Sequence, residues 1–305
     1  MGKVQASLVS FGGWDNCVKL THGKVELIVT TEVGPRIIRY AFVGGPNIMC
    51  EKEGQMGDKN SNEWRIYGGH RLWHSPESMP RTYELDNTPV RYELTENGVN
   101  TYQDVEKWAQ IEKQMEITMD EETSEVTVLH RIINRGAWEI EASAWAMSVL
   151  STGGKEIVPQ DRTDTGLLSN RVMAIWPYTH LNDPRVCFGH KYITLRQDPG
   201  IAQPFKIGTS NTLGWTAYFN HNNCLVKYFD VDKDLPYPDH DTCFQTYTCD
   251  FMLEMETLSP LYLIGAGEAI EHREVWNLFD NIAMPSDDED EISAVMSKLL
   301  KDVEV

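Results

Sequence analysis

The chain has 305 residues, of which 41% are hydrophobic and 10% aromatic, a composition typical of a folded globular protein rather than a disordered one. It contains 46 acidic residues against 27 Lys and Arg, and the resulting net charge of −19 disfavours nucleic acid and anionic membranes as partners. No stretch of apolar residues is long enough for a transmembrane helix, and no signal-peptide pattern is present, so we expect a cytoplasmic protein. Six scattered cysteines without a CxxC pair are expected to be reduced thiols.

Most of the chain has the residue pattern of β-strands. Short segments rich in β-branched and aromatic residues predict strands at 25–30, 36–42, 110–120, 125–134, 139–150 and 224–229. Residues 110–120 and 125–134 are predicted to form an antiparallel hairpin through the turn at 121–124. Alternating helical segments are missing, so a parallel α/β fold is excluded. The sequence therefore predicts an all-β protein in which residues 1–284 form one large antiparallel β-sandwich domain.

Helical periodicity is confined to the end of the chain, and it predicts an amphipathic helix within residues 285–305. Ser286 is the expected N-cap, and the acidic residues that follow it suit the positive end of the helix dipole. Apolar residues then recur with helical spacing on one face, at Ile292, Val295, Met296, Leu299 and Leu300. We expect this face to pack on the body of the protein or on a partner chain, and a homo-oligomer stays open.

The segment YGGHRLWHSPE (67–77) concentrates residue types suited to a binding pocket. Two glycines before the histidines and Pro76 after them favour an extended or looped backbone. In an extended backbone, at ~3.3 Å per residue, His70 and His74 lie about 13 Å apart and cannot share a metal ion. Either histidine offers proton transfer near neutral pH. Three neighbours are candidate substrate-binding residues, namely Arg71 for hydroxyl or carboxylate groups, Trp73 for stacking, and Glu77. The alternative is a structural loop with buried aromatic side chains.

A second candidate site lies on the strand-like segment around residues 252–257. Alternation places Glu254 and Glu256 on one face of an otherwise apolar strand, which is unexpected unless that face lines a polar cavity. Burial there would raise the pKa of a carboxyl and make it a usable general acid or base. The alternative is a pair of solvated carboxylates on an outward face.

A third acidic segment, DVDKDLPYPDHD (230–241), lacks the glycine that a calcium-binding EF-hand loop requires. Asp239 follows Pro238 in a predicted loop, where it could hold sugar hydroxyls or a divalent cation such as Ca²⁺. We otherwise expect no metal and no cofactor. Lys206 lies in a strand-like context and is a weaker candidate for substrate binding.

Taken in chain order, four motifs resemble the galactose mutarotase-like superfamily, the aldose 1-epimerases and their relatives. They are VGPRIIRYAFVGGPNIM (33–49), GGHRLWHSPE (68–77), WAMSVLSTGGKEIVPQ (145–160) and LEMETLSPLYLIGAGEAIEHREVW (253–276). The likeness extends over about residues 15–280 and is greatest to an atypical branch that carries the GGHRLWHSPE signature. The resemblance implies a β-supersandwich whose concave face binds a sugar.

In the epimerases a glutamate takes the proton of the anomeric hydroxyl and a histidine protonates the ring oxygen. Carried over to this chain, the base would be Glu254 or Glu256, the acid would be His70 or His74, and Arg71 would hold hydroxyls, together with Asp239. One departure weakens the epimerase inference, because the segment that holds a second histidine in epimerases reads AMSVLSTGG (146–154) here. His180 or His190 would have to replace it.

Three functions are therefore open at this stage. The first is an isomerase of the mutarotase type acting on an aldose. The second is a glycoside hydrolase or lyase that uses the paired carboxylates on oligosaccharide. The third is a non-catalytic carbohydrate-binding protein, in which Trp64, Trp73 and Trp176 stack on sugar faces.

Overall fold

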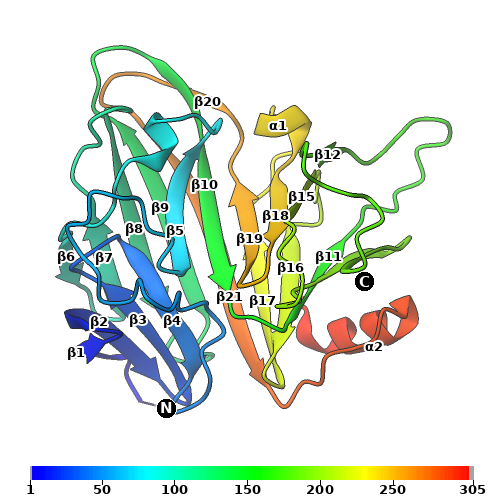
Figure 1. Cartoon of the computed structure of the whole chain (residues 1–305), viewed down its shortest axis with the longest axis horizontal. Coiled ribbons are helices and arrows are strands. Elements are labelled where there is room, and N and C mark those ends of the chain that lie inside the picture. The colour runs from blue at the N-terminus through cyan, green and yellow to red at the C-terminus, as the bar shows by residue number, and fades with distance from the viewer. Residues whose placement is uncertain (1, 302–305) are drawn as a thin grey trace.

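The computed structural model describes residues 2–301 and consists mainly of two large antiparallel β-sheets (Figure 1). In spatial order, the first sheet contains β1 (Gln5–Phe11), β2 (Trp14–His22), β3 (Val25–Thr30), β4 (Arg36–Phe42), β5 (Gly69–Ser75), β10 (Ile140–Leu150), β19 (Leu253–Leu258), β18 (Phe244–Thr248), β15 (Phe205–Thr209) and β12 (Met173–Ile175), and β20 (Tyr262–Ile264) pairs with β10. The second sheet contains β13 (Val186–Phe188), β14 (Tyr192–Arg196), β11 (Lys155–Pro159), β16 (Trp215–Asn220), β17 (Asn223–Phe229), β21 (Ala269–Asp280), β9 (Val126–Asn134), β8 (Ile111–Met119), β7 (Gly98–Tyr102) and β6 (Arg91–Leu94). Three short helical elements complete the fold: η1 (Arg81–Tyr83), α1 (Pro238–Asp241) and α2 (Glu289–Leu299).

This architecture confirms the predicted all-β sandwich. The predicted strands correspond to β3, β4, β8, β9, β10 and β17, within one residue of the expected bounds. The predicted hairpin is also present, since β8 and β9 pair from Ile111 opposite Asn134 to Met119 opposite Val126. These segments were predictable because period-two alternation, β-branched residues and polar turns all indicate the same structure.

The hydrophobic core lies between the two sheets. Its side chains come from the inward faces of both sheets, and Leu27, Met255, Val128 and Trp276 are among those with no exposed surface. Strand β10 is central to the first sheet because it pairs with β5 on one side and with β19 on the other. The two candidate segments of the sequence therefore flank one strand.

The glycine pair before β5 is required by close packing of the backbone. Gly68 and Gly69 have φ angles of +107° and +70°, and a Cβ atom would lie 1.9 Å from the carbonyl oxygen of Cys50 and 2.4 Å from that of Ile37, respectively. Neighbouring segments of the chain itself occupy the space beside these glycines, so their role is backbone packing and not ligand access.

Helix α2 packs on the body of the protein rather than standing free. Ile292, Met296 and Leu299 are buried against a cluster that includes Trp215 and Val226 of the second sheet. The N-cap is Asp288, not Ser286 as predicted, because the Asp288 carboxylate accepts hydrogen bonds from the first-turn backbone amides. The helix ends at Leu299, and residues 302–305 of the predicted segment lie outside the described chain. No helix in the described part of the chain has the length and apolar character needed to cross a membrane.

Replacing Asp288 with Ala is expected to lower the free energy of unfolding by about 1 kcal/mol, since two amides lose their acceptor. Urea unfolding followed by circular dichroism measures the change. Ser297→Ala on the exposed face of α2 is the control and should change stability by less than about 0.5 kcal/mol. Equal stability of the two variants would contradict the capping role.

Candidate active site

Strand β5 divides the predicted site residues between two faces of the first sheet. Alternate side chains in a strand point to opposite faces, so His70 and His74 lie on one face and Arg71 and Trp73 on the other. His70 points into the sandwich interior, where it contacts His130 of the second sheet. Arg71 and Trp73 therefore point away from the second sheet.

Neighbouring strands add their side chains to the outer face that carries Arg71 and Trp73. On β10, Met147 lies opposite Arg71 and Trp145 opposite Trp73. Across β10, Met147 also lies opposite Glu256 of β19. Glu254 shares the face of Glu256, as the sequence pattern predicted, and it is opposite Tyr247 of β18.

This outer face contains a cavity of about 270 Å³, which we call the aromatic hollow. Its wall combines aromatic side chains with both signs of charge, a mixture suited to the flat faces and hydroxyl groups of a sugar. The lining residues are Trp64, Ile66, Arg71, Trp73, Glu77, Tyr83, Trp145, Met147, Tyr178, Lys206, Tyr247, Met252 and Glu254.

Loops before and after β5 form one wall of the hollow. The buried Arg36 guanidinium donates to the carbonyl oxygens of Ile66 and Gly68, at 3.1 and 3.3 Å, and also pairs with Asp86. These contacts of Arg36 fix the position of the segment that carries Trp64 and Ile66. On the other side of β5, the Tyr83 hydroxyl donates to the Glu77 carboxylate, which holds the exposed Glu77 at the rim.

The acid–base candidate of the hollow is Glu254. Burial, and to a lesser extent the neighbouring Glu256, raise the pKa of its carboxyl to about 7 against the opposing effect of Arg71. The Arg71 Nη2 atom lies 3.9 Å from Glu254 Oε1, too far for a hydrogen bond, and Oε1 is buried without a partner among residues 2–301. A carboxyl with a pKa near 7 is suited to both accepting and donating a proton at neutral pH.

Glu256 has a different environment from Glu254. Its Oε2 atom accepts hydrogen bonds from Lys206 Nζ at 2.9 Å and from Trp145 Nε1 at 2.8 Å, and the carboxylate has no exposed surface. Lys206 in turn lies over the rings of Trp145 and Trp176, with its Nζ atom 4.8 Å from each centroid. The two carboxylates on one strand face are therefore not equivalent. Glu256 forms an ion pair with Lys206 and does not line the hollow, whereas Glu254 does.

His70 and His74 lie outside the hollow, so the expected arrangement of an imidazole beside Glu254 or Glu256 is wrong. His74 is buried on the interior face, where its Nδ1 atom is 3.9 Å from the Glu106 carboxylate. Burial lowers the pKa of His74 to about 3, so the ring is neutral at physiological pH. His180 and His190 are exposed and line no part of the hollow.

The interior face instead holds a fully buried polar network around His70 and Glu274. His130 Nδ1 donates to a backbone carbonyl of β21 at 2.9 Å, so in the neutral ring its Nε2 atom must accept from His70 Nε2–H at 2.7 Å. His70 Nδ1 then accepts from the Ser148 hydroxyl. Lys227 Nζ donates to Ser148 Oγ at 2.7 Å and to Glu274 Oε1 at 3.0 Å. The network thus crosses between the two sheets with one proton in each hydrogen bond.

One group of the described residues has ligand atoms close enough together to hold a metal ion: His70, His130 and Glu274. The arrangement fits a metal poorly. The two Nε2 atoms already share a hydrogen bond, and the Lys227 ammonium pairs with the only carboxylate. A divalent cation there would add two positive charges beside a buried lysine. We therefore interpret the group as a structural network.

Asp239 does not line the hollow. Its Oδ2 atom accepts a hydrogen bond at 2.7 Å from Gln245, the residue opposite Glu256 on the adjacent strand. Asp239 and His240 have φ angles of 51° and 65°, in the left-handed region, so the single turn of α1 is not a regular helix. In the structure Asp239 orients Gln245.

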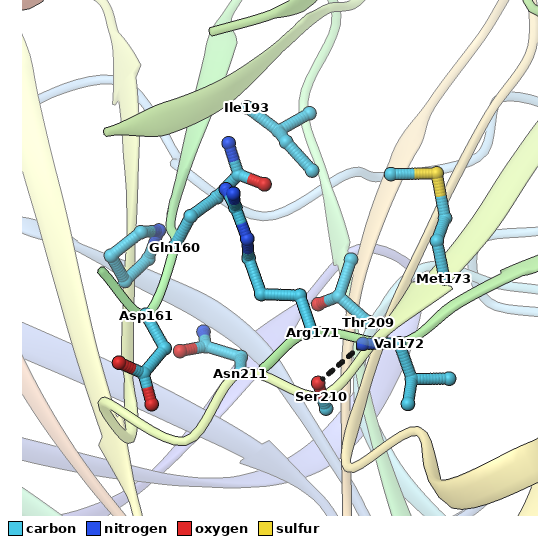
Figure 2. Close-up of a pocket in the computed structure, with 10 residues that line it drawn as sticks. Gln160, Asp161, Arg171, Val172, Met173, Ile193, Thr209, Ser210 and Asn211 are labelled. Carbon is cyan, nitrogen blue, oxygen red and sulfur yellow. Dashed lines mark hydrogen bonds between the residues drawn. The ribbon is translucent and has the colours of Figure 1, made fainter. Parts of the chain in front are cut away.

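A second cavity, of about 280 Å³, is lined by residues of β12 and β15 at one edge of the first sheet and by residues of β11 and β14 in the second sheet (Figure 2). The Arg171 side chain extends into it, and Val172 closes one side through a hydrogen bond from its amide to Ser210 Oγ at 2.9 Å. Its lining contains no aromatic side chain. Its one carboxylate, Asp161, already accepts hydrogen bonds from Thr163 and Thr212. The aromatic hollow is therefore the better candidate for an active site.

No protein-family model and no curated protein matches the sequence. Solved structures with a similar fold include a galactose mutarotase-like protein from Lactobacillus casei, with a TM-score of 0.58 at 8% identity over 86% of this chain and 100% of that one. A candidate aldose 1-epimerase from Klebsiella pneumoniae gives 0.58 at 11% identity, over 99% of this chain and 88% of that one. A TPR-domain containing protein from Parabacteroides distasonis gives 0.62 at 13% identity, over 95% of this chain and 49% of that one. The chain thus has the galactose mutarotase-like fold that its motifs resemble.

Proposed function

We propose that this protein binds a sugar in the aromatic hollow and interconverts its anomers, with Glu254 as the general base. One observation carries the proposal: Glu254, with a pKa of about 7, faces a cavity walled by aromatic rings on the outer face of a mutarotase-like sheet. Aromatic walls favour stacking on a pyranose ring, and a carboxylate of that pKa accepts protons at neutral pH.

The proposed reaction is a reversible opening of the sugar ring. The Glu254 carboxylate takes the proton of the anomeric hydroxyl, the C1–O1 bond becomes a carbonyl, and the bond between C1 and the ring oxygen breaks. The ring oxygen receives a proton from Lys206, which is buried at the wall of the hollow. Rotation about the C1–C2 bond and reversal of both transfers give the other anomer and restore both side chains. Lys206 thus replaces the histidine acid of the epimerases in this proposal.

Hydrolysis by paired carboxylates is less well supported, although both acids are on the same strand face. A glycosidase of that kind needs one carboxylate as nucleophile or base and the other as acid. Here the Glu256 carboxylate is ion-paired with Lys206 and fully buried. A non-catalytic binding protein would use the same aromatic wall, so measured turnover decides between binding and catalysis.

Anomer exchange measured by NMR with a panel of aldoses and their acidic derivatives tests the proposal. We expect exchange faster than the uncatalysed rate for at least one sugar, with no release of reducing ends from oligosaccharides. Reducing-end release would instead indicate a hydrolase or lyase. Saturable binding without exchange would leave a carbohydrate-binding protein and overturn the catalytic proposal.

The pH dependence of kcat/KM is expected to follow the ionisation of Glu254. Because burial raises the pKa of this base to about 7, its ionised form is lost as pH falls through that value. The rate at pH 6 should therefore be roughly one tenth of the plateau reached above pH 8, after the uncatalysed rate has been subtracted. A flat profile between pH 6 and pH 8 would show that the base has an ordinary carboxyl pKa, and it would contradict the assignment.

A further inference from the structure

Arg71 is a buried cation without a hydrogen-bond acceptor. The residue is only 2% exposed, its Nε and Nη1 atoms have no partner among the described residues, and its Nη2 atom is 3.9 Å from the nearest carboxylate oxygen. Leaving a buried charged donor unsatisfied is costly, so such groups are usually paired. Since Arg71 lines the aromatic hollow, a bound molecule can supply the missing acceptors.

Two indole rings fix the orientation of the Arg71 guanidinium. Its Cζ atom lies 4.2 Å from the ring centroid of Trp73 and 5.0 Å from that of Trp64. Stacking of this kind covers the faces of the planar group and leaves its N–H donors, which lie in the plane, available for hydrogen bonds. The stacked guanidinium is thus held ready for a planar acceptor with two oxygens.

Arg71 is the cation of the hollow that lacks a hydrogen-bonded counterion among the described residues. Lys206 and Glu256 neutralise each other at 2.9 Å. Glu254 is partly protonated near neutral pH, and Glu77 is exposed at the rim, where solvent screens it. The N–H donors of Arg71 are therefore free for one anionic acceptor, whether Glu254 is ionised or not.

We infer that the natural sugar carries a carboxylate, as a hexuronic acid does, and that Arg71 binds this carboxylate through two parallel hydrogen bonds. The inference rests on the proposed function and adds the class of substrate to it. A carboxylate matches the planar guanidinium fork and brings a single charge. A dianionic phosphate matches the hollow less well, because the other cation of the lining, Lys206, is already paired with Glu256 and leaves a second negative charge without a partner.

The placement of Arg71 beside Glu254 agrees with the chemistry of such a sugar. In a hexuronic acid the carboxylate is attached to C5, and the ring oxygen joins C5 to the anomeric carbon. The carboxylate on C5 and the anomeric hydroxyl on C1 are thus attached to the two carbons that flank the ring oxygen. A carboxylate held by Arg71 brings the anomeric side of the ring towards Glu254, whose Oε1 atom is 3.9 Å from the guanidinium.

Binding and anomer exchange of five probes test the inference: D-galacturonate, D-glucuronate, D-galactose, D-glucose and D-glucose 6-phosphate. We expect the uronates to bind about 10- to 100-fold more tightly than the matching neutral sugars. In Arg71→Met, whose side chain keeps an apolar stem, that preference should be largely lost. In Arg71→Lys, which keeps the charge without the fork, it should be reduced to an intermediate value.

A comparison of two ligands on the unaltered protein keeps the inference testable even if the Arg71 variants do not fold. D-Galacturonamide has the shape of the uronate but no charge, and it should bind the unaltered protein about 10-fold or more weakly than D-galacturonate. Equal affinity for the acid, the amide and the neutral sugar would overturn the carboxylate inference and leave sugar binding intact. Preference for the 6-phosphate would overturn it in favour of a dianion. Failure of all the probes to bind would overturn the proposed function as well.

Discussion

Replacing Glu254 with Gln is expected to lower the rate of anomer exchange by about 10²- to 10⁴-fold, the usual contribution of a general acid–base group. Gln keeps the shape of the side chain and the hydrogen-bonding reach but cannot accept the anomeric proton. The substitution also removes a buried carboxyl, so it should not destabilise the fold. Sugar affinity should change much less than turnover, because the aromatic wall remains.

NMR exchange spectroscopy and a binding titration on the same preparation separate the two effects. Glu271→Gln is a matched control, because Glu271 is an exposed carboxylate on β21 that pairs with Arg131 at the surface. Its exchange rate should equal that of the unaltered protein. If Glu254→Gln retained more than half of the activity, another group would have to be the base.

Replacing Lys227 with Met is expected to lower the free energy of unfolding by about 3–5 kcal/mol, the range found when one partner of a buried ion pair is removed. Lys227 and Glu274 have no exposed surface, and their charged atoms are 3.0 Å apart. Although burial alone would raise the pKa of Glu274, the Lys227 ammonium lowers it below its ordinary value. Loss of Lys227 leaves a buried charge without its counterion and removes the donor to Ser148.

Equilibrium unfolding in urea measures this change. Arg273→Met is the control, because Arg273 is adjacent to Glu274 on β21 but forms its ion pair with Asp230 at the surface. An exposed pair contributes about 0–1 kcal/mol, so the control should be close to the unaltered protein. A similar small loss in Lys227→Met would show that the network does not stabilise the interior.

The fold was predictable to a large extent because its signals are local. Strands such as β3 and the hairpin of β8 and β9 carry period-two alternation and turn residues within short windows. The same alternation correctly placed Glu254 and Glu256 on one strand face. The N-cap of α2 was predicted wrongly, since Ser286 and Asp288 are both good capping residues and only the backbone geometry distinguishes them.

The composition of the site was only partly predictable. Period-two alternation excludes His70 and Arg71 from a common cavity once residues 69–75 form a strand, and this signal was available in the sequence. Which of the two faces lies inside the sandwich depends on pairing with β10 and on packing against the second sheet, neither of which a local pattern contains. The histidines of the motif thus became interior residues.

Several residues of the hollow come from segments far apart in the chain, so no local motif identifies them. Trp64 lies in the loop before β5, Tyr83 lies in η1 after it, and Tyr178 follows β12. Tyr247 enters because β18 pairs with β19 and sets it opposite Glu254. Their convergence depends on strand order, which loop lengths and residue types leave undetermined.

The most direct test of the account is a crystal structure of the protein with its tightest-binding monosaccharide. We expect the pyranose ring to lie in the aromatic hollow, with its anomeric hydroxyl within about 3.2 Å of a Glu254 carboxylate oxygen. A sugar bound instead in the cavity that contains Arg171, with the aromatic hollow empty at saturation, would contradict the assignment of the site.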